Sequence, residues 1–173
     1  MKQLAAKTFF LFALPVFIFM VSEGNAGQKN TLAEIWLAAQ YQSDVQSVKG
    51  IMKAADVDRV TVQFFKVGIP AGILAVGKNT PADGARKAIE IAMKYNRKKI
   101  EFLIPEVLLP ENYLAVGTSA YDESALIPVR PEDVALLSDP SLTTEQFHAV
   151  YLKLTRGDLP FQKDYTRRFN NPR

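Results

Sequence analysis

The sequence predicts an α/β or α+β fold with a mixed sheet of four or five strands, a central crossover helix, an N-terminal helical segment and a C-terminal helix. Three observations support this prediction. An apolar run at 73–76 precedes a polar turn and an amphipathic pattern that extends to about residue 96. Apolar and polar residues alternate at 59–67 and at 100–104, which indicates strands. A capping box at 143–146 followed by a helical stripe indicates the C-terminal helix.

The first 26 residues have the order of a secretory signal peptide. Lys2 and Lys7 are followed by an apolar stretch at 9–21, and small residues at 24–26 precede the expected cleavage site. A retained membrane anchor is the alternative, but this stretch spans only about 20 Å as a helix, less than the roughly 30 Å core of a bilayer. We therefore expect cleavage after Ala26, a periplasmic or secreted product, and no later transmembrane segment.

Composition limits the classes of function. The chain has no cysteine, which excludes disulfides and thiolate metal sites and favours a bacterial periplasm over a disulfide-stapled extracellular module. A formal net charge of +3 in 173 residues gives no signal for nucleic-acid binding. We expect one globular domain at 27–160 and a basic tail at 161–173, with no metal and no cofactor.

The N-terminal part of the domain carries two capping-box patterns, at 31–34 and 43–46. Leu32, Ile35 and Trp36 follow the first box at helical spacing, and a second apolar stripe follows the second box. The two stripes are about half a turn out of register. The sequence therefore predicts either one kinked helix or two short helices at the start of the domain.

The next elements predict strands around a helix. The turn-rich connection at 68–72 is short enough for an antiparallel hairpin between the strands at 59–67 and 73–76. Thr80 can cap the following helix by accepting from the N–H of Asp83, with Pro81 as the first helical residue. The strand at 100–104 should then run parallel to the one at 73–76.

The C-terminal half continues with short elements. An apolar loop at 106–111 leads to a strand at 113–117, and 125–129 is a candidate edge strand because it contains Pro128. A brief helix is predicted from Pro131, and the last helix should follow the third capping box and end at Gly157.

Candidate ligand-binding residues lie where a predicted strand gives way to a helix. Lys78, Asn79 and Thr80 occupy that position, which suits a small anionic ligand, although a solvated and well-capped turn is the commoner explanation of such residues. If the strand at 113–117 runs in the same direction, further polar residues join them at one rim of the sheet. These residues are Thr118, Ser119 and Asp122.

A phosphate-binding loop is not predicted at this place. Gly72, Gly77 and Lys78 have its spacing, but Asn79 stands where serine or threonine is required. The residues between the two glycines have the pattern of a strand interior, which offers no free N–H groups to a phosphate.

No catalytic residue is predicted. His148 is the only histidine, and neither Ser119 nor Ser124 lies in a nucleophile elbow. The carboxylate pairs of Asp122 with Glu123 and of Glu101 with Glu106 could serve hydrolytic or metal chemistry, or they could simply keep loops solvated.

These patterns lead to two hypotheses. In the first, the protein is a non-catalytic accessory or adaptor of the cell envelope that binds another envelope protein through the apolar loop residues Val107, Leu108 and Leu109, the sheet edge or the tail. In the second, it is a small periplasmic enzyme or ligand-binding protein with a pocket formed by the loops at 78–80 and 118–123.

Overall fold

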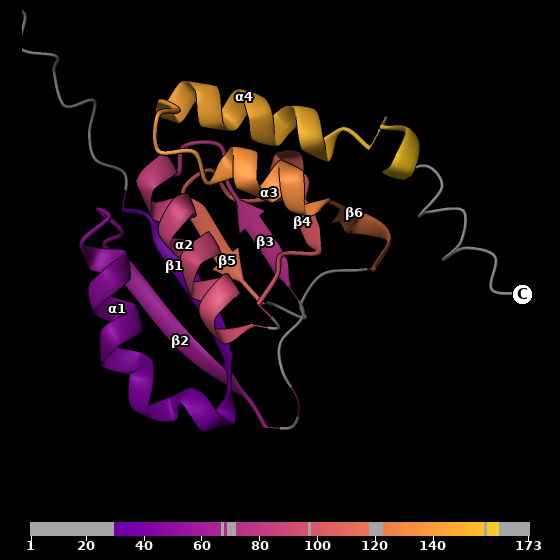
Figure 1. Ribbon diagram of the computed structural model, residues 1–173. Coiled ribbons are helices and arrows are strands. Elements are labelled where there is room, and N and C mark those ends of the chain that lie inside the picture. The colour runs from indigo at the N-terminus through magenta and orange to yellow at the C-terminus, as the bar shows by residue number, and fades with distance from the viewer. Residues whose placement is uncertain are drawn as a thin grey trace, which may run out of the picture.

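Across residues 30–66, 68, 72–96, 98–117, 123–157 and 159–162, which the computed structural model describes, six strands form one mixed sheet with helices packed against it (Figure 1). The strands are β1 (Leu32–Ala38), β2 (Arg59–Phe65), β3 (Ile73–Val76), β4 (Phe102–Ile104), β5 (Tyr113–Val116) and β6 (Ile127–Pro128). The helices are η1 (Ala39–Asp44), α1 (Val45–Lys53), α2 (Ala82–Tyr95), η2 (Glu106–Leu108), η3 (Glu123–Ala125), α3 (Pro131–Leu137) and α4 (Thr144–Thr155), where η marks a 3-10 helix. The predicted class is confirmed, with six strands where four or five were expected.

The sheet has the strand order β2-β1-β5-β3-β4-β6. β1 pairs in parallel with both β2 and β5, and β3 pairs in parallel with β4. β5 is antiparallel to β3, and β6 is antiparallel to β4. The sheet thus consists of two parallel crossover units, β1-α1-β2 and β3-α2-β4, joined through β5.

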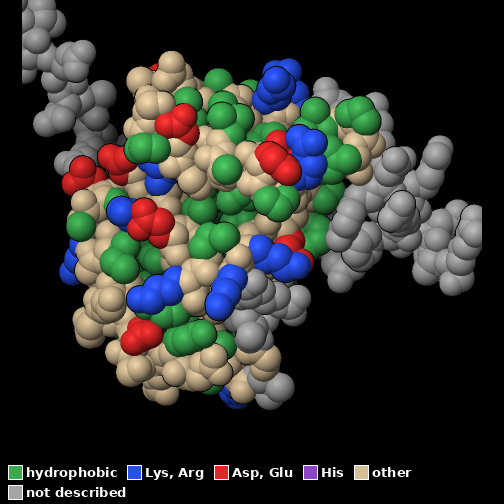
Figure 2. Space-filling view, in the orientation of Figure 1, with side chains coloured by type: hydrophobic (Ala, Val, Ile, Leu, Met, Phe, Trp, Pro, Cys, Tyr) green, Lys and Arg blue, Asp and Glu red, His purple; other side chains and the backbone are tan. Residues whose placement is uncertain are grey.

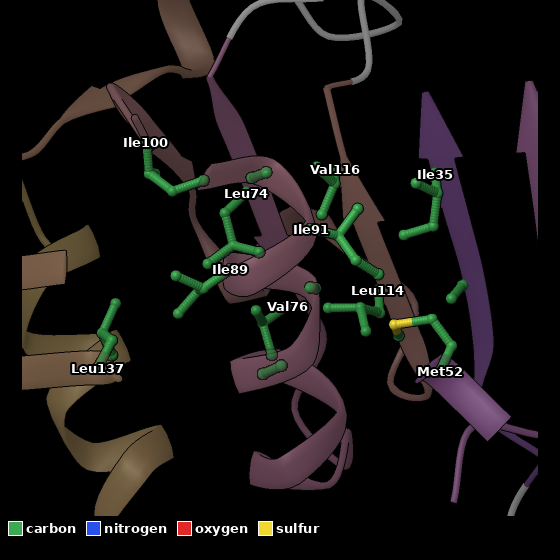
Figure 3. Packing of buried hydrophobic residues seen from close by; sticks show 14 of the residues in the cluster. Ile35, Met52, Leu74, Val76, Ile89, Ile91, Ile100, Leu114, Val116 and Leu137 are labelled. Carbon is green, nitrogen blue, oxygen red and sulfur yellow. The ribbon is translucent and has the colours of Figure 1, made fainter. Parts of the chain in front are cut away.

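The helices bury their apolar side chains against one face of this sheet. Ile35, Leu74 and Val116 of the strands pack in one cluster with Ile89 and Ile91 of α2, and Leu137 borders this cluster on the α3 side (Figure 3). The opposite face carries a smaller cluster of strand residues, to which Leu109 adds a partly buried side chain. The main core therefore lies between the sheet and the helices, where burial of apolar surface stabilises the fold most.

The prediction of a helix at 31–38 is wrong, because this segment forms β1. Ala33, Ile35 and Leu37 are buried while the residues between them are partly exposed, which is a period of two. Residues 32, 35 and 36 fit helical spacing as well, so periodicity alone could not separate the two structures. The second half of the predicted helical segment is correct, since η1 and α1 occupy 39–53.

The predicted hairpin between 59–67 and 73–76 is also wrong. β2 pairs with β1 along its whole length, while β3 lies between β5 and β4. The pattern at 31–38 predicts a helix, and a helix there leaves β2 without the strand that it pairs with in the structure.

The central unit agrees with expectation. β3 is buried on both faces, α2 connects it to β4, and the two strands are parallel neighbours. One detail differs: Pro81 is the N-cap of α2, no side chain caps this helix, and the Thr80 hydroxyl donates to the carbonyl of Tyr113 instead. Thr80 therefore links α2 to β5 rather than closing the first turn.

The C-terminal elements also follow the predictions. β6 is an edge strand that contains Pro128, and α3 begins at Pro131. Thr143 caps α4 through the predicted capping box with Gln146. The packed chain continues past residue 160, because the Gln162 amide is buried and donates to two backbone carbonyls.

The two ends of the chain lie outside this description. The predicted signal peptide and residues 163–173 of the predicted tail fall among the residues that are not described. Of the helices in the described ranges, none is both long enough and apolar enough to cross a membrane.

Candidate functional site

The candidate ligand loop at 78–80 is tied to the segment that leads into β5. The Asn79 N–H donates to the carbonyl of Glu111 at 2.7 Å, and the Asn79 amide donates to the Glu111 carboxylate at 3.0 Å. Thr80 is buried, and its hydroxyl donates to the Tyr113 carbonyl at 3.0 Å. Asn79 and Thr80 thus hold two loops together, and Lys78 remains exposed beside them.

The direction of β5 bears on the rim predicted between this loop and the residues that follow β5. The shared rim required β3 and β5 to run in the same direction, but they are antiparallel, with Val76 opposite Leu114. The N–H of Gly117 donates to the carbonyl of Ile73, so β5 ends beside the start of β3, away from Lys78. Thr118, Ser119 and Asp122 lie outside the described residues. The common direction of β3 and β5, on which the shared rim depended, is therefore not found in the sheet.

Lys78 instead borders a surface depression of about 460 Å³ between the loop after β3, η2 and α4. The residues that line it are Lys78, Asn79, Glu106, Thr144, Glu145, His148, Ala149 and Leu152. Two carboxylates stand beside the single lysine, so the charges of this depression do not favour an anion. Within the described residues there is no group of three or more histidine, aspartate or glutamate side chains that could hold a metal ion.

His148 forms the central contact of the depression. Its Nδ1 lies 2.7 Å from the Glu106 carboxylate, and its Nε2 lies 2.8 Å from the Thr80 carbonyl. Both side chains of the pair are 14% exposed. A carbonyl only accepts hydrogen bonds, so Nε2 carries a proton, and neither ring nitrogen is free to activate a nucleophile.

Glu145 is the second carboxylate at this place. It lies in the first turn of α4, and its pKa is lowered, first by a hydrogen bond with its own backbone N–H and then by the Thr143 hydroxyl. The charge of His148 adds a smaller effect in the same direction. Glu145 is therefore ionised near neutral pH and presents a negative charge to the histidine.

Tyr151, one turn after His148, fixes α4 to the sheet. Its ring is fully buried, and its hydroxyl accepts from the Val76 N–H at 3.1 Å. The same hydroxyl lies 2.8 Å from the Ile104 carbonyl and 3.2 Å from the Leu74 carbonyl. It therefore bonds to β3 and β4 at the point where the two strands separate, just before the loops that border the depression.

The apolar loop presents two of its three candidate residues to solvent. Val107 is 87% exposed and Leu108 is 55% exposed, and we call these two residues the apolar tip. Leu109 turns inward and packs against the smaller cluster, so its assignment to the same contact surface is not supported. Exposed apolar side chains that adjoin one another, rather than ones scattered singly, mark a candidate contact surface.

The frame around the apolar tip is well connected. Pro105 and Pro110 flank it, and the N–H of Leu108 donates to the carbonyl of Pro105 at 2.9 Å. Gly77 lies so close to Pro110 that a Cβ at residue 77 would overlap the proline carbonyl. The end of β3 and the loop that carries the apolar tip are thus in direct backbone contact.

Sequence reasoning did not find the pairing of His148 with Glu106. Glu106 was considered only with Glu101, but Glu101 forms an ion pair with Lys99. The two paired residues are 42 positions apart, and no local pattern links η2 to α4.

Comparison with protein-family models found no match, and comparisons with curated proteins and with solved structures found no similar chain. The function is therefore inferred from the residues and contacts of this chain.

Proposed function

We propose that the protein is a non-catalytic accessory or adaptor protein of the bacterial cell envelope, and that its apolar tip binds another envelope protein. The observation that carries this proposal is the exposure of Val107 at 87%, next to Leu108 at 55%. The signal-peptide pattern at 1–26 and the absence of cysteine support the location.

The apolar tip suits a protein partner because its frame is ordered before binding. Leu109 is packed, Glu106 is paired with His148, and prolines flank the turn. A preorganised turn loses little conformational entropy on association, so more of the apolar burial contributes to affinity. Burial of a leucine or valine side chain contributes about 1.5–3 kcal/mol.

The contacts of the depression support a non-catalytic role. Both ring nitrogens of His148 are engaged, and the hydroxyl of Thr144, which lines the depression, already accepts from the N–H of Ala82. The face in Figure 2 carries acidic and basic side chains interspersed among apolar ones, whereas a polyanion is bound by clustered basic side chains.

The test is a comparison of two variants in affinity capture from envelope extract. Val107→Asp combined with Leu108→Asp should remove a stoichiometric partner, with affinity lowered roughly a hundredfold for about 3 kcal/mol of lost apolar burial. Leu136→Asp is the matched control, because Leu136 is an exposed leucine on α3, at 46%. Thermal unfolding should be unchanged in both variants.

Equal capture by the tip variant and the control variant would rule out the apolar tip as the contact surface. A photo-crosslinking residue placed at 107 gives an independent result. It should label the same partner, whereas the same residue placed at 136 should not.

A further inference from the structure

The two hydrogen bonds of the His148 ring need two protons. A neutral imidazole beside an ionised carboxylate carries only one, so the contact with Glu106 holds an extra proton. Nε2 must be protonated to donate to the Thr80 carbonyl, which leaves no proton on Nδ1 of a neutral ring. Nδ1 nevertheless lies 2.7 Å from the Glu106 carboxylate. A hydrogen bond at that distance requires a further proton, either on the ring as imidazolium or on the carboxyl group.

Loss of this proton would place two lone pairs against each other at a site where each side chain is only 14% exposed. Water cannot readily replace the lost hydrogen bond there, and the two groups would have to separate. Glu106 is the first residue of η2 and immediately precedes Val107. Separation of the pair therefore releases one of the restraints on the apolar tip.

The charged groups around the pair come from three elements. Glu106 faces the ring from η2, Lys78 borders the same depression from the loop after β3, and Glu145 lies on α4 itself. The ring of Phe147 packs edge-on against His148 and contributes no charge. The charged groups that border the contact are therefore two carboxylates, Glu106 included, and one ammonium group.

We propose that the contact between His148 and Glu106 is a pH-sensitive latch that holds the apolar tip while the extra proton is present and loosens it when the proton is lost. The latch regulates the surface assigned under the proposed function and rests on that assignment for its biological role. Histidine is the side chain that ordinarily titrates in the physiological range. On this proposal, the protein presents an ordered apolar tip at mildly acidic pH and a looser one at alkaline pH.

The single histidine makes the latch directly measurable. In untagged protein labelled with 15N-histidine, one pair of ring nitrogen signals belongs to His148. We expect the methyl signals of Val107 and Leu108 to change in the same pH step as these ring signals. Amide exchange at 107–109, corrected for its intrinsic pH dependence, should accelerate about tenfold or more over that step, as expected for a lost hydrogen bond to a charged group.

Glu106→Gln is the decisive variant. A glutamine amide can donate to Nδ1 of a neutral ring while Nε2 still donates to Thr80, so the geometry needs no extra proton. The pH dependence of exchange at 107–109 should therefore disappear, while the apolar tip stays in place. Glu111→Gln is the control, because it removes a carboxylate from the same loop without touching the histidine, and it should retain the wild-type pH dependence.

Two outcomes would overturn the latch: methyl signals of the apolar tip that do not follow the ring titration, or a pH dependence that persists in Glu106→Gln. These measurements need no partner, so they decide the latch even if the proposed binding function fails. Conversely, a partner captured through the apolar tip with equal strength at both ends of the pH range would support the binding function and contradict the latch.

Discussion

Tyr151 and His148 lie one turn apart on α4, and both tie this helix to segments near the apolar tip, but they do so through different chemistry. The Tyr151 hydroxyl bonds to neutral backbone groups of β3 and β4 and is fully buried. The His148 ring bonds to a carboxylate and to a loop carbonyl, and it keeps some contact with solvent.

We call the contacts of Tyr151 the constant anchor, because they do not depend on pH. We call the contact of His148 with Glu106 the conditional anchor, because it depends on a proton. Backbone N–H and carbonyl groups carry no charge and do not titrate, so the bonds of Tyr151 to them do not change over the physiological range. The contact of His148 with Glu106 depends on a proton that can be lost. We therefore expect α4 to stay on the sheet at all physiological pH values, while the loop beside it responds to pH.

The largest expected effect comes from removing the constant anchor. Tyr151→Phe keeps the ring but leaves the Val76 N–H and the Ile104 carbonyl without their partner. Each buried unsatisfied group costs about 1–3 kcal/mol, so we expect a loss of about 3 kcal/mol in the free energy of unfolding. Urea denaturation should show this loss equally at acidic and alkaline pH. A loss confined to one pH would show that the contribution of Tyr151 depends on pH.

A smaller and pH-dependent effect is expected from the conditional anchor. His148→Gln should cost about 2 kcal/mol at mildly acidic pH, where the wild-type pair has its extra proton. This difference should shrink as the pH rises, because the contact binds a proton in the folded state and its contribution is lost when that proton leaves. Urea denaturation of both proteins at several pH values checks the sign, and a cost that grows with pH would be incompatible with the latch.

The smallest expected effect concerns the neighbouring carboxylate. Glu145→Gln removes one negative charge near His148 without touching either of its hydrogen bonds. The ring should then lose its proton at a slightly lower pH, because less negative charge stabilises the protonated form. NMR titration of the ring nitrogens measures this shift. An opposite shift would show that Glu145 does not act on the histidine through its charge.

The parts of the fold that could be predicted depend on local patterns. The buried run at 73–76, the amphipathic helix and the strand at 100–104 are close in sequence, and their periods differ clearly. At 31–38 the same reasoning failed, because Leu32, Ile35 and Trp36 suit a helix while Ala33, Ile35 and Leu37 suit a strand. Only the pairing of this segment with β2 and β5 decides between the two.

The candidate site was predictable to a smaller extent. An apolar loop between two prolines predicts that Val107 and Leu108 are exposed. The same pattern does not predict that the side chain of Leu109 packs inward. The direction of β5 decided which loops meet Lys78, and strand direction is not encoded in the strand's own residues. For the same reason the pair of His148 and Glu106 could be recognised only from the folded chain.

The position of β5 has a consequence for how the chain folds. Each crossover unit, at 32–65 and at 73–104, pairs its own two strands and can form from nearby contacts. β5 comes later in the chain and lies between the two units in the sheet. Non-local pairing carries a larger loop-closure entropy and forms more slowly. We therefore expect two pre-formed halves during synthesis and a late insertion of β5 that joins them, with unpaired edges of β1 and β3 exposed until that step is complete.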